Sequence, residues 1–201
     1  MNRTTDLIVG ALLMIVLVTL VLVVFPFAQL RPVKPPPGLK PYTAAQLRGR
    51  AVYVSEGCMY CHSQQPRDPA QGPDMQRGWG RPSTPADYYY DDPILLGTMR
   101  TGPDLFNIGQ RQPSKTWHLI HLYQPRAVVP GSVMPAFPYL FRVTGEMQKD
   151  VEPLALPEQY RVPGYYVVPT REALDMVDYL VSLNHIYPIL QGDATAQEAA
   201  R

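Results

Sequence analysis

The sequence has 201 residues, which leaves room for one compact domain and an appendage. Its formal net charge is +1 at pH 7, and phosphate binding needs a basic stripe, so we do not expect a nucleic-acid partner. Charged residues make up 17% of the chain and apolar residues 46%, which is charge-poor for a wholly soluble protein. The 23 prolines predict many turns and extended loops, because the proline ring fixes φ.

The first expected element is a membrane anchor, residues 1–30. Residues 7–28 are apolar and uncharged, with Thr19 as the polar interruption. At about 1.5 Å per residue, a helix of this length crosses a hydrocarbon core of about 30 Å. A cleaved signal peptide has a shorter apolar region and a small-x-small cleavage site, whereas here the sequence Phe25-Pro26-Phe27-Ala28 follows a long apolar run. We therefore favour an uncleaved anchor over a signal peptide.

A proline-rich linker, residues 31–42, follows the anchor. Five prolines lie between Arg31 and Pro41, a composition that favours polyproline II at about 3.1 Å per residue. The linker is therefore expected to be a stiff spacer. Positive charges stand on both sides of the apolar run, at Arg3 and at Arg31, Lys34 and Lys40, so counting them does not set the orientation of the anchor.

The main domain is expected over residues 43–190, followed by a flexible tail at 191–201. Thr43 and Gln46 form a capping-box pattern that predicts a helix to about Glu56, with Gly57 as its stop. A second helix is predicted over 114–123, ended by Pro125. A third is predicted over 170–184, where apolar residues recur at helical spacing and predict one buried face.

A haem-attachment pattern, Cys58-Met59-Tyr60-Cys61-His62, follows the first of these helices. Two thiols two residues apart can form thioethers to the porphyrin, and the histidine directly after them ligates the iron as the proximal ligand. The sequence therefore predicts one covalently bound haem c, held by Cys58, Cys61 and His62. Covalent haem attachment implies maturation outside the cytoplasm, so we expect the amino terminus inside and the bulk of the chain outside.

Two other sites share part of this pattern. A thioredoxin-like dithiol also places two cysteines two residues apart, but it needs a βαβ setting that the surroundings of Cys58 do not predict. A zinc finger needs further ligands at finger spacing, and His118 is too distant from Cys61 to supply one. The haem interpretation is the best supported of the three.

The order of features over residues 43–184 resembles a class I cytochrome c. A helix leads into the haem motif, followed by a Gly-Pro-Asp-Leu stretch at 102–105, a helix with Trp117, a Met134-Pro135 pair and a closing amphipathic helix. The resemblance implies a mainly α fold in which the terminal helices cross. It also implies that the Pro103 carbonyl accepts a hydrogen bond from His62, and that Met134 is the sixth ligand of the iron.

The residues themselves also favour Met134 over the other candidate methionines. It lies between Pro130 and Pro135, where a stiff backbone can present a thioether at a fixed place, and a methionine ligand raises the potential of a haem. Met176 falls within the apolar pattern of the last helix and is expected in the core. The remaining candidates are Met75, Met99, Met147 and the histidines other than His62.

A closer resemblance is to the mono-haem subunit of cbb3-type cytochrome c oxidases. It is carried by the runs at 100–105 (RTGPDL), 117–126 and 128–138 (VVPGSVMPAFP), by the single anchor and by the length. The resemblance implies electron transfer from a further cytochrome c subunit or a soluble cytochrome c to haem b of a haem-copper catalytic subunit in the bacterial inner membrane, where oxygen reduction resides. The alternatives are a subunit of a related nitric oxide reductase and a free-standing anchored shuttle.

Other residues are candidates for lesser roles. Trp117 and Arg126 are expected near the haem, where each can bond a propionate. His118 and His121 share one helix face and are expected to pack near the haem edge or at a partner interface rather than to hold a second metal. His185 is expected to be a cation near a helix end. The tyrosines at 88–90, within an unusual 64–97 insertion, are expected in a docking patch or a loop cover.

Overall fold

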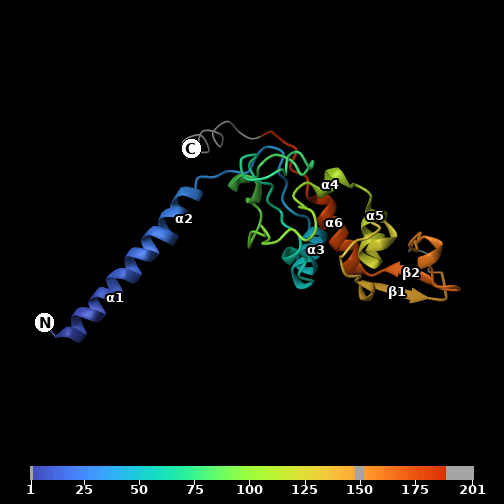
Figure 1. Ribbon diagram of the computed structural model, residues 1–201, viewed down its shortest axis with the longest axis horizontal. Coiled ribbons are helices and arrows are strands. Elements are labelled where there is room, and N and C mark those ends of the chain that lie inside the picture. The colour runs from blue at the N-terminus through green and yellow to red at the C-terminus, as the bar shows by residue number, and fades with distance from the viewer. Residues whose placement is uncertain (1, 148–151, 189–201) are drawn as a thin grey trace.

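The computed structural model describes residues 2–147 and 152–188, and the described chain is mainly helical (Figure 1). The tail expected at 191–201 and the last two residues of the expected main domain lie outside the described residues. A long N-terminal helix stands apart from a domain in which α3 and α6 lie next to each other (Figure 1).

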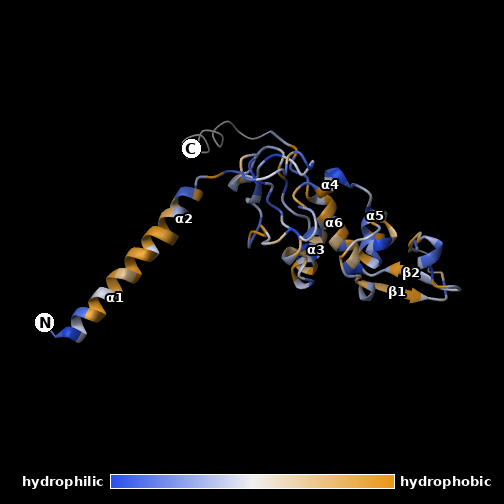
Figure 2. Ribbon diagram, viewed as in Figure 1, coloured by the Kyte–Doolittle hydropathy of each residue, from blue (hydrophilic) through white to orange (hydrophobic). Residues whose placement is uncertain are grey.

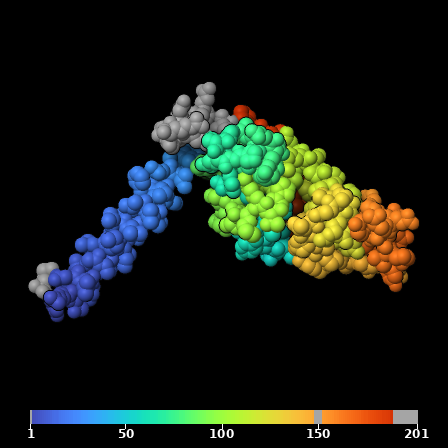
Figure 3. All heavy atoms as spheres, in the orientation of Figure 1, coloured from blue at the N-terminus to red at the C-terminus, as the bar shows by residue number. Residues whose placement is uncertain are grey.

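The N-terminal helix comprises α1 (Arg3–Thr19), a π-helical turn η1 (Leu20–Val24) and α2 (Phe25–Leu30). Its 28 residues span roughly 42 Å at the α-helical rise, and no residue of its most apolar window is buried. Figure 2 shows that hydrophobic residues make up most of its length, and Figure 3 shows it as a rod that stands apart from the domain. Its length and composition are sufficient to cross a membrane.

The linker is not the continuous polyproline II spacer that its composition predicts. Turns close where the Val33 N–H donates to Leu30 O and where the Leu39 N–H donates to Pro36 O, each at 3.0 Å. Pro36 is buried, and Gly38 lies so close to Tyr187 that a Cβ at position 38 would overlap the tyrosine side chain. The linker is therefore packed against the end of the domain, which composition alone does not reveal.

Helix α3 (Ala44–Ser55) begins and ends where the sequence predicts. The Thr43 N–H donates to Gln46 Oε1 at 2.8 Å, and the Gln46 N–H donates to Thr43 Oγ1 at 3.3 Å, so the predicted capping box is confirmed. Gly57 stops the helix with φ +70°, a conformation that favours glycine. A 3₁₀ turn, η2 (Cys58–Tyr60), follows at once and carries the first cysteine.

Helix α6 (Arg171–Ser182), capped by Thr170, packs against α3 to form the centre of the domain. The two backbones meet at Gly49, where a Cβ would overlap the carbonyl group of Asp175. Beside this contact the rings of Tyr53 and Tyr179 pack edge to face with centroids 5.5 Å apart. The absence of a side chain at position 49 therefore allows the two helices to approach this closely.

Short elements complete the domain. The second predicted helix is confirmed as α5 (Lys115–Tyr123), with Ser114 as its cap, and α4 (Ile108–Arg111) precedes it. Two strands that the sequence did not predict, β1 (Phe141–Thr144) and β2 (Tyr166–Pro169), pair antiparallel with Phe141 opposite Pro169. The remaining elements are 3₁₀ turns: η3 (Pro85–Tyr88), η4 (Pro125–Ala127), η5 (Pro138–Leu140) and η6 (Glu158–Tyr160).

The expectation that His185 is a cation near a helix end is wrong. Its side chain is buried, its ring stacks on Phe106 with centroids 3.9 Å apart, and its Nδ1 lies 2.6 Å from the Phe106 carbonyl oxygen. Burial lowers the pKa of His185 below its ordinary value, which favours the neutral ring. The segment around His185, which follows α6, is therefore packed into the domain.

Candidate functional site

A cavity of about 460 Å³ opens between α3, α5, α6 and the loop before η5, within the size range of cofactor sites. It brings together six of the seven residues expected to bind the cofactor: Cys58, Cys61, His62, Pro103, Trp117 and Met134 line it, together with His118 and His121. Much of the remaining wall is apolar and includes Leu105, Ile108, Leu122, Phe137, Met176 and Leu180.

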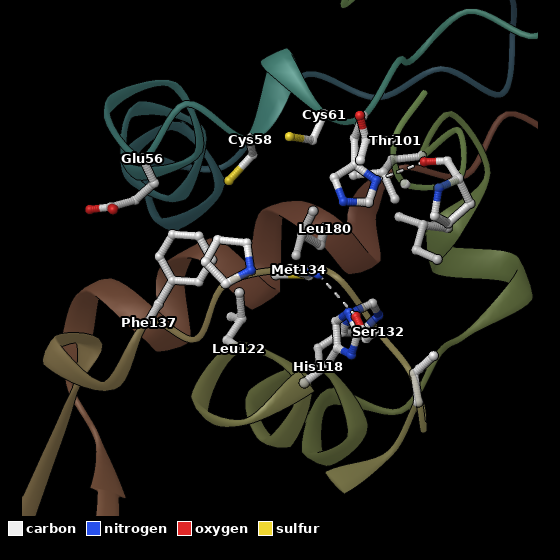
Figure 4. Close-up of a pocket in the computed structure, with 18 of the residues that line it drawn as sticks. Glu56, Cys58, Cys61, Thr101, His118, Leu122, Ser132, Met134, Phe137 and Leu180 are labelled. Carbon is white, nitrogen blue, oxygen red and sulfur yellow. Dashed lines mark hydrogen bonds between the residues drawn. The ribbon is translucent and has the colours of Figure 1, made fainter. Parts of the chain in front are cut away.

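Both cysteines are free thiols at this cavity. Figure 4 shows their sulfur atoms and the Met134 side chain on facing sides of the same space. Burial raises the pKa of the Cys58 thiol to about 12, whereas a redox-active dithiol depends on a lowered pKa. Among the residues that the structure describes, no cluster of three or more histidine, cysteine or acidic side chains forms a metal site. The thioredoxin and zinc interpretations are therefore disfavoured.

The imidazole of His62 is held from two sides. Its Nδ1 lies 2.7 Å from the Pro103 carbonyl oxygen, which only accepts hydrogen bonds, so Nδ1 carries the proton and Nε2 keeps a free lone pair. Gly102 lies flat against the ring, where any Cβ would overlap it. Burial lowers the pKa of His62, although the bond to Pro103 works in the opposite direction. The ring is therefore a neutral, oriented imidazole whose Nε2 can ligate a metal.

Met134 is half-buried, and its N–H donates to Ser132 Oγ at 3.2 Å. Of the other methionines, Met176 is fully buried in α6, as its position in the apolar pattern predicts, and it also contributes to the cavity wall. Met75, Met99 and Met147 are about half exposed or more and do not line the cavity. Met134 is thus the candidate that combines access to the cavity with a place outside the helical core.

The polar wall of the cavity differs in part from expectation. The indole of Trp117 stacks on His121 with centroids 4.7 Å apart, and His118 Nε2 lies 2.8 Å from the Gln112 carbonyl oxygen. Arg126 is exposed and is not among the residues that line the cavity, so its contact with a propionate stays a prediction. It sits in η4, just beyond the turn that Pro125 imposes after α5.

Sequence reasoning missed three polar residues of the wall, Glu56, Thr101 and Ser132. The described residues of the lining include no lysine or arginine, and Glu56 is the one carboxylate among them. The signal that could have found Glu56 is its position two residues before Cys58, at the end of the helix that presents the motif.

The 64–97 insertion packs elsewhere. None of its described residues lines the cavity, which argues against a loop cover over the cofactor. The Tyr88 hydroxyl donates to the Gln64 carbonyl at 2.7 Å, and its ring packs near Phe106 at a centroid distance of 6.0 Å. Tyr89 is about half exposed. The tyrosine run is thus split between the domain interior and the surface.

The residues present fit a covalently attached haem. Two thiols, a neutral imidazole with a free Nε2 and a thioether supply the nitrogen and sulfur donors that haem iron accepts, and apolar walls surround them. The segment carrying the cysteines is also fixed to the segment carrying Pro103, because the Gly102 N–H donates to the Cys61 carbonyl at 2.9 Å.

Comparison with known proteins agrees with this chemistry. No curated protein matches the chain. A family model described as cytochrome c oxidase, mono-heme subunit/FixO, matches residues 1–177, which is most of the sequence. The chain therefore belongs to the family of mono-haem subunits of cytochrome c oxidase.

Proposed function

We propose that this chain is the electron-transfer subunit of a cbb3-type haem-copper oxidase, with one haem c attached through Cys58 and Cys61. The observation that carries the proposal is the single cavity in which both thiols, the Pro103-bound imidazole of His62 and the Met134 thioether meet. Family membership supports the oxidase assignment.

Each of these residues has a defined task. Cys58 and Cys61 fix the cofactor covalently, and His62 offers Nε2 while Pro103 holds the ring in one tautomer. Met134 supplies a soft thioether, which favours a high potential. When bound, the haem supplies a one-electron iron couple. The chain contributes position, a largely apolar surrounding and the choice of ligands.

The proposed placement follows from the anchor and the cofactor chemistry. The helix Arg3–Leu30 spans the bacterial inner membrane once, with its amino terminus in the cytoplasm and the class I cytochrome c-like domain on the outer side. Electrons arrive from a further cytochrome c subunit or a soluble cytochrome c and leave to haem b of the membrane-embedded catalytic subunit, where oxygen is reduced. The packing of Gly38 against Tyr187 favours a fixed partner over a long-range shuttle.

The test is gentle detergent extraction of the full chain through an affinity tag, followed by a haem and metal count of the complex. Haem b and copper in the complex support the oxidase assignment. Haem b with non-haem iron and without copper would instead assign the chain to a nitric oxide reductase. Haem c alone, at one per chain, would assign the chain to a free-standing membrane-anchored shuttle.

A further inference from the structure

A buried carboxylate lies behind the segment that carries His62. The Asp104 side chain has no solvent exposure and accepts hydrogen bonds at both oxygens. Oδ2 accepts from Ser63 Oγ at 2.7 Å and from the Gln65 N–H at 2.8 Å, while Oδ1 accepts from the Phe106 N–H at 2.9 Å. Burial raises the pKa of Asp104, whereas the three hydrogen bonds and the charge of Arg100 act in the opposite direction. Three donors on two oxygens, with no acceptor facing them, are the pattern of an ionised carboxylate.

These bonds join the two chain segments that create the His62 site. One segment continues from His62 through Ser63 to Gln65, and the other runs from Gly102 to Phe106. The Leu105 N–H also donates to the Ser63 carbonyl at 2.7 Å. The two segments that the His62 to Pro103 hydrogen bond joins are therefore also joined by backbone hydrogen bonds and by the Asp104 carboxylate.

Two guanidinium groups face this carboxylate. Arg100 Nη2 lies 3.8 Å from Asp104 Oδ2, and its Nε donates to Ser63 Oγ at 2.8 Å. Arg111 donates to the Asp104 backbone carbonyl. A second buried carboxylate, Asp74, accepts from Arg100 Nη1 at 2.7 Å. Asp74, Asp104, Arg100 and Arg111 thus form a cluster with two negative and two positive charges. Removing the charge of one aspartate leaves the cluster net positive.

Asp74 provides an internal comparison. It is as buried as Asp104 and shares Arg100, but its other side-chain hydrogen bond comes from the Arg67 N–H at 2.7 Å. Within the described part of the chain, the Asp74 carboxylate is connected to residues 61–65 and 102–106 through the Arg100 side chain and not directly. Asp104 is therefore bonded directly to the segments that carry His62 and Pro103, whereas Asp74 is not.

We propose that Asp104 is a positioning residue for the proximal ligand. It locks the His62 segment to the Pro103 segment. Its buried negative charge makes the midpoint potential of the haem lower than it would be with the same iron ligands and a neutral residue at position 104. The charge acts because a nearby anion stabilises the oxidised, more positive iron, and hydrogen bonding around a ligand is one of the means by which proteins tune haem potential. This inference rests on the proposed haem site.

The test uses the full membrane-anchored chain with its haem attached. Asp104→Asn, which keeps the shape but removes the charge and one acceptor, is expected to retain covalent haem, to shift the midpoint potential upward and to change the g values of the ferric electron paramagnetic resonance spectrum. Asp74→Asn is the matched control and is expected to give a smaller potential shift and wild-type g values. Equal shifts in the two variants would overturn the proposal.

A second variant keeps the proposal testable if Asp104→Asn fails to fold. Ser63→Ala removes one hydrogen bond to the carboxylate but leaves its charge, so it is expected to change the g values with little shift in potential. Wild-type g values in Ser63→Ala would contradict the positioning role. A wild-type chain that carries no covalent haem would overturn the proposed function itself, whereas haem-loaded variants that behave as wild type overturn this inference alone.

Discussion

Gly102 lies against the imidazole of His62 so closely that a single methyl group at position 102 would overlap Cε1. The glycine is thus part of the wall that orients the ring, while the adjacent Pro103 carbonyl fixes its tautomer. Gly102 thus orients His62 by packing, and Pro103 orients it by hydrogen bonding. This relationship lets a change at position 102 act on His62 without altering the donor atoms.

Gly102→Ala should therefore displace the His62 ring. We expect covalent haem to be retained, the ligand-dependent visible absorption to change, and the free energy of unfolding to fall by about 1–3 kcal/mol, as is typical of overpacking. Guanidinium denaturation and absorption spectra of the oxidised protein measure both effects. Gly72→Ala is the control, because its Cβ would lie 3.6 Å from the nearest atom. Wild-type spectra in Gly102→Ala would contradict the close contact.

Met134→Ala should remove the sulfur-to-iron charge-transfer absorption of the oxidised protein while the haem stays covalently bound, because the thioethers at Cys58 and Cys61 are untouched. Met99→Ala, at an exposed position away from the cavity, should keep the band. Near-infrared and visible spectra of the two variants make the comparison. Survival of the band in Met134→Ala would assign the sixth ligand to another residue.

Gly49→Ala should separate the two main helices. The new Cβ would overlap the Asp175 carbonyl, a backbone group of α6 that cannot rotate away, so we expect a loss of about 3 kcal/mol or more in the free energy of unfolding. Chemical denaturation of the holoprotein measures the loss, again with Gly72→Ala as the control. A loss no larger than that of the control would mean that α3 and α6 can move apart without cost.

The protein should lose stability as the pH falls, in part through His185. Burial holds its folded pKa below the ordinary 6.5, with Asp87 opposing and Arg81 reinforcing the shift. Between the folded and unfolded pKa values the unfolded chain binds more protons, so this contribution is complete above 6.5 and declines as the pH falls toward the folded pKa.

His185→Gln removes this titration. Its unfolding free energy should therefore fall less between about pH 7.5 and about pH 5.5 than that of the wild type, although its stability at the higher pH is lower because the stacking on Phe106 is lost. Denaturation curves at the two pH values give the slopes. Identical slopes would show that His185 titrates alike in the folded and unfolded chains.

Gly38→Ala should loosen the linker. Its Cβ would overlap the Tyr187 side chain, so we expect chymotrypsin to cut faster after Leu39 and Tyr42 in the intact, membrane-anchored protein. Tyr187→Phe keeps the ring but removes the hydroxyl bond to Asp87 at 2.9 Å, and it should have the smaller effect. The measurement is the rate of limited proteolysis. Cleavage at the wild-type rate in Gly38→Ala would argue against a packed linker.

Features with local causes were predictable from the sequence. The start of α3 depends on the Thr43 and Gln46 side chains, which bond within one turn, and the start of α5 depends on Ser114 three residues before Trp117. The spacing of Cys58, Cys61 and His62 likewise indicates its chemistry without any distant partner. Composition gave the N-terminal apolar helix for the same reason.

Features with distant causes were not predictable in this way. Strands β1 and β2 pair across a long connection, and neither carries a strong strand pattern of its own. Arg126 was expected near the cofactor from its chemistry alone, but the turn at Pro125 places it on the surface. Asp104 lies inside a motif that the sequence does single out, yet its partner Ser63 is far away in the chain.

The pairing of α3 with α6 also sets an order of events during synthesis. The cavity takes its walls from both helices, one near the start of the domain and one close to its end, so it cannot form until most of the chain has been made. Until then Cys58 and Cys61 lie on unfolded polypeptide, and afterwards folding partly buries Cys58. The haem attachment that we propose therefore has a natural window, between the emergence of the two cysteines and the completion of the cavity by α6.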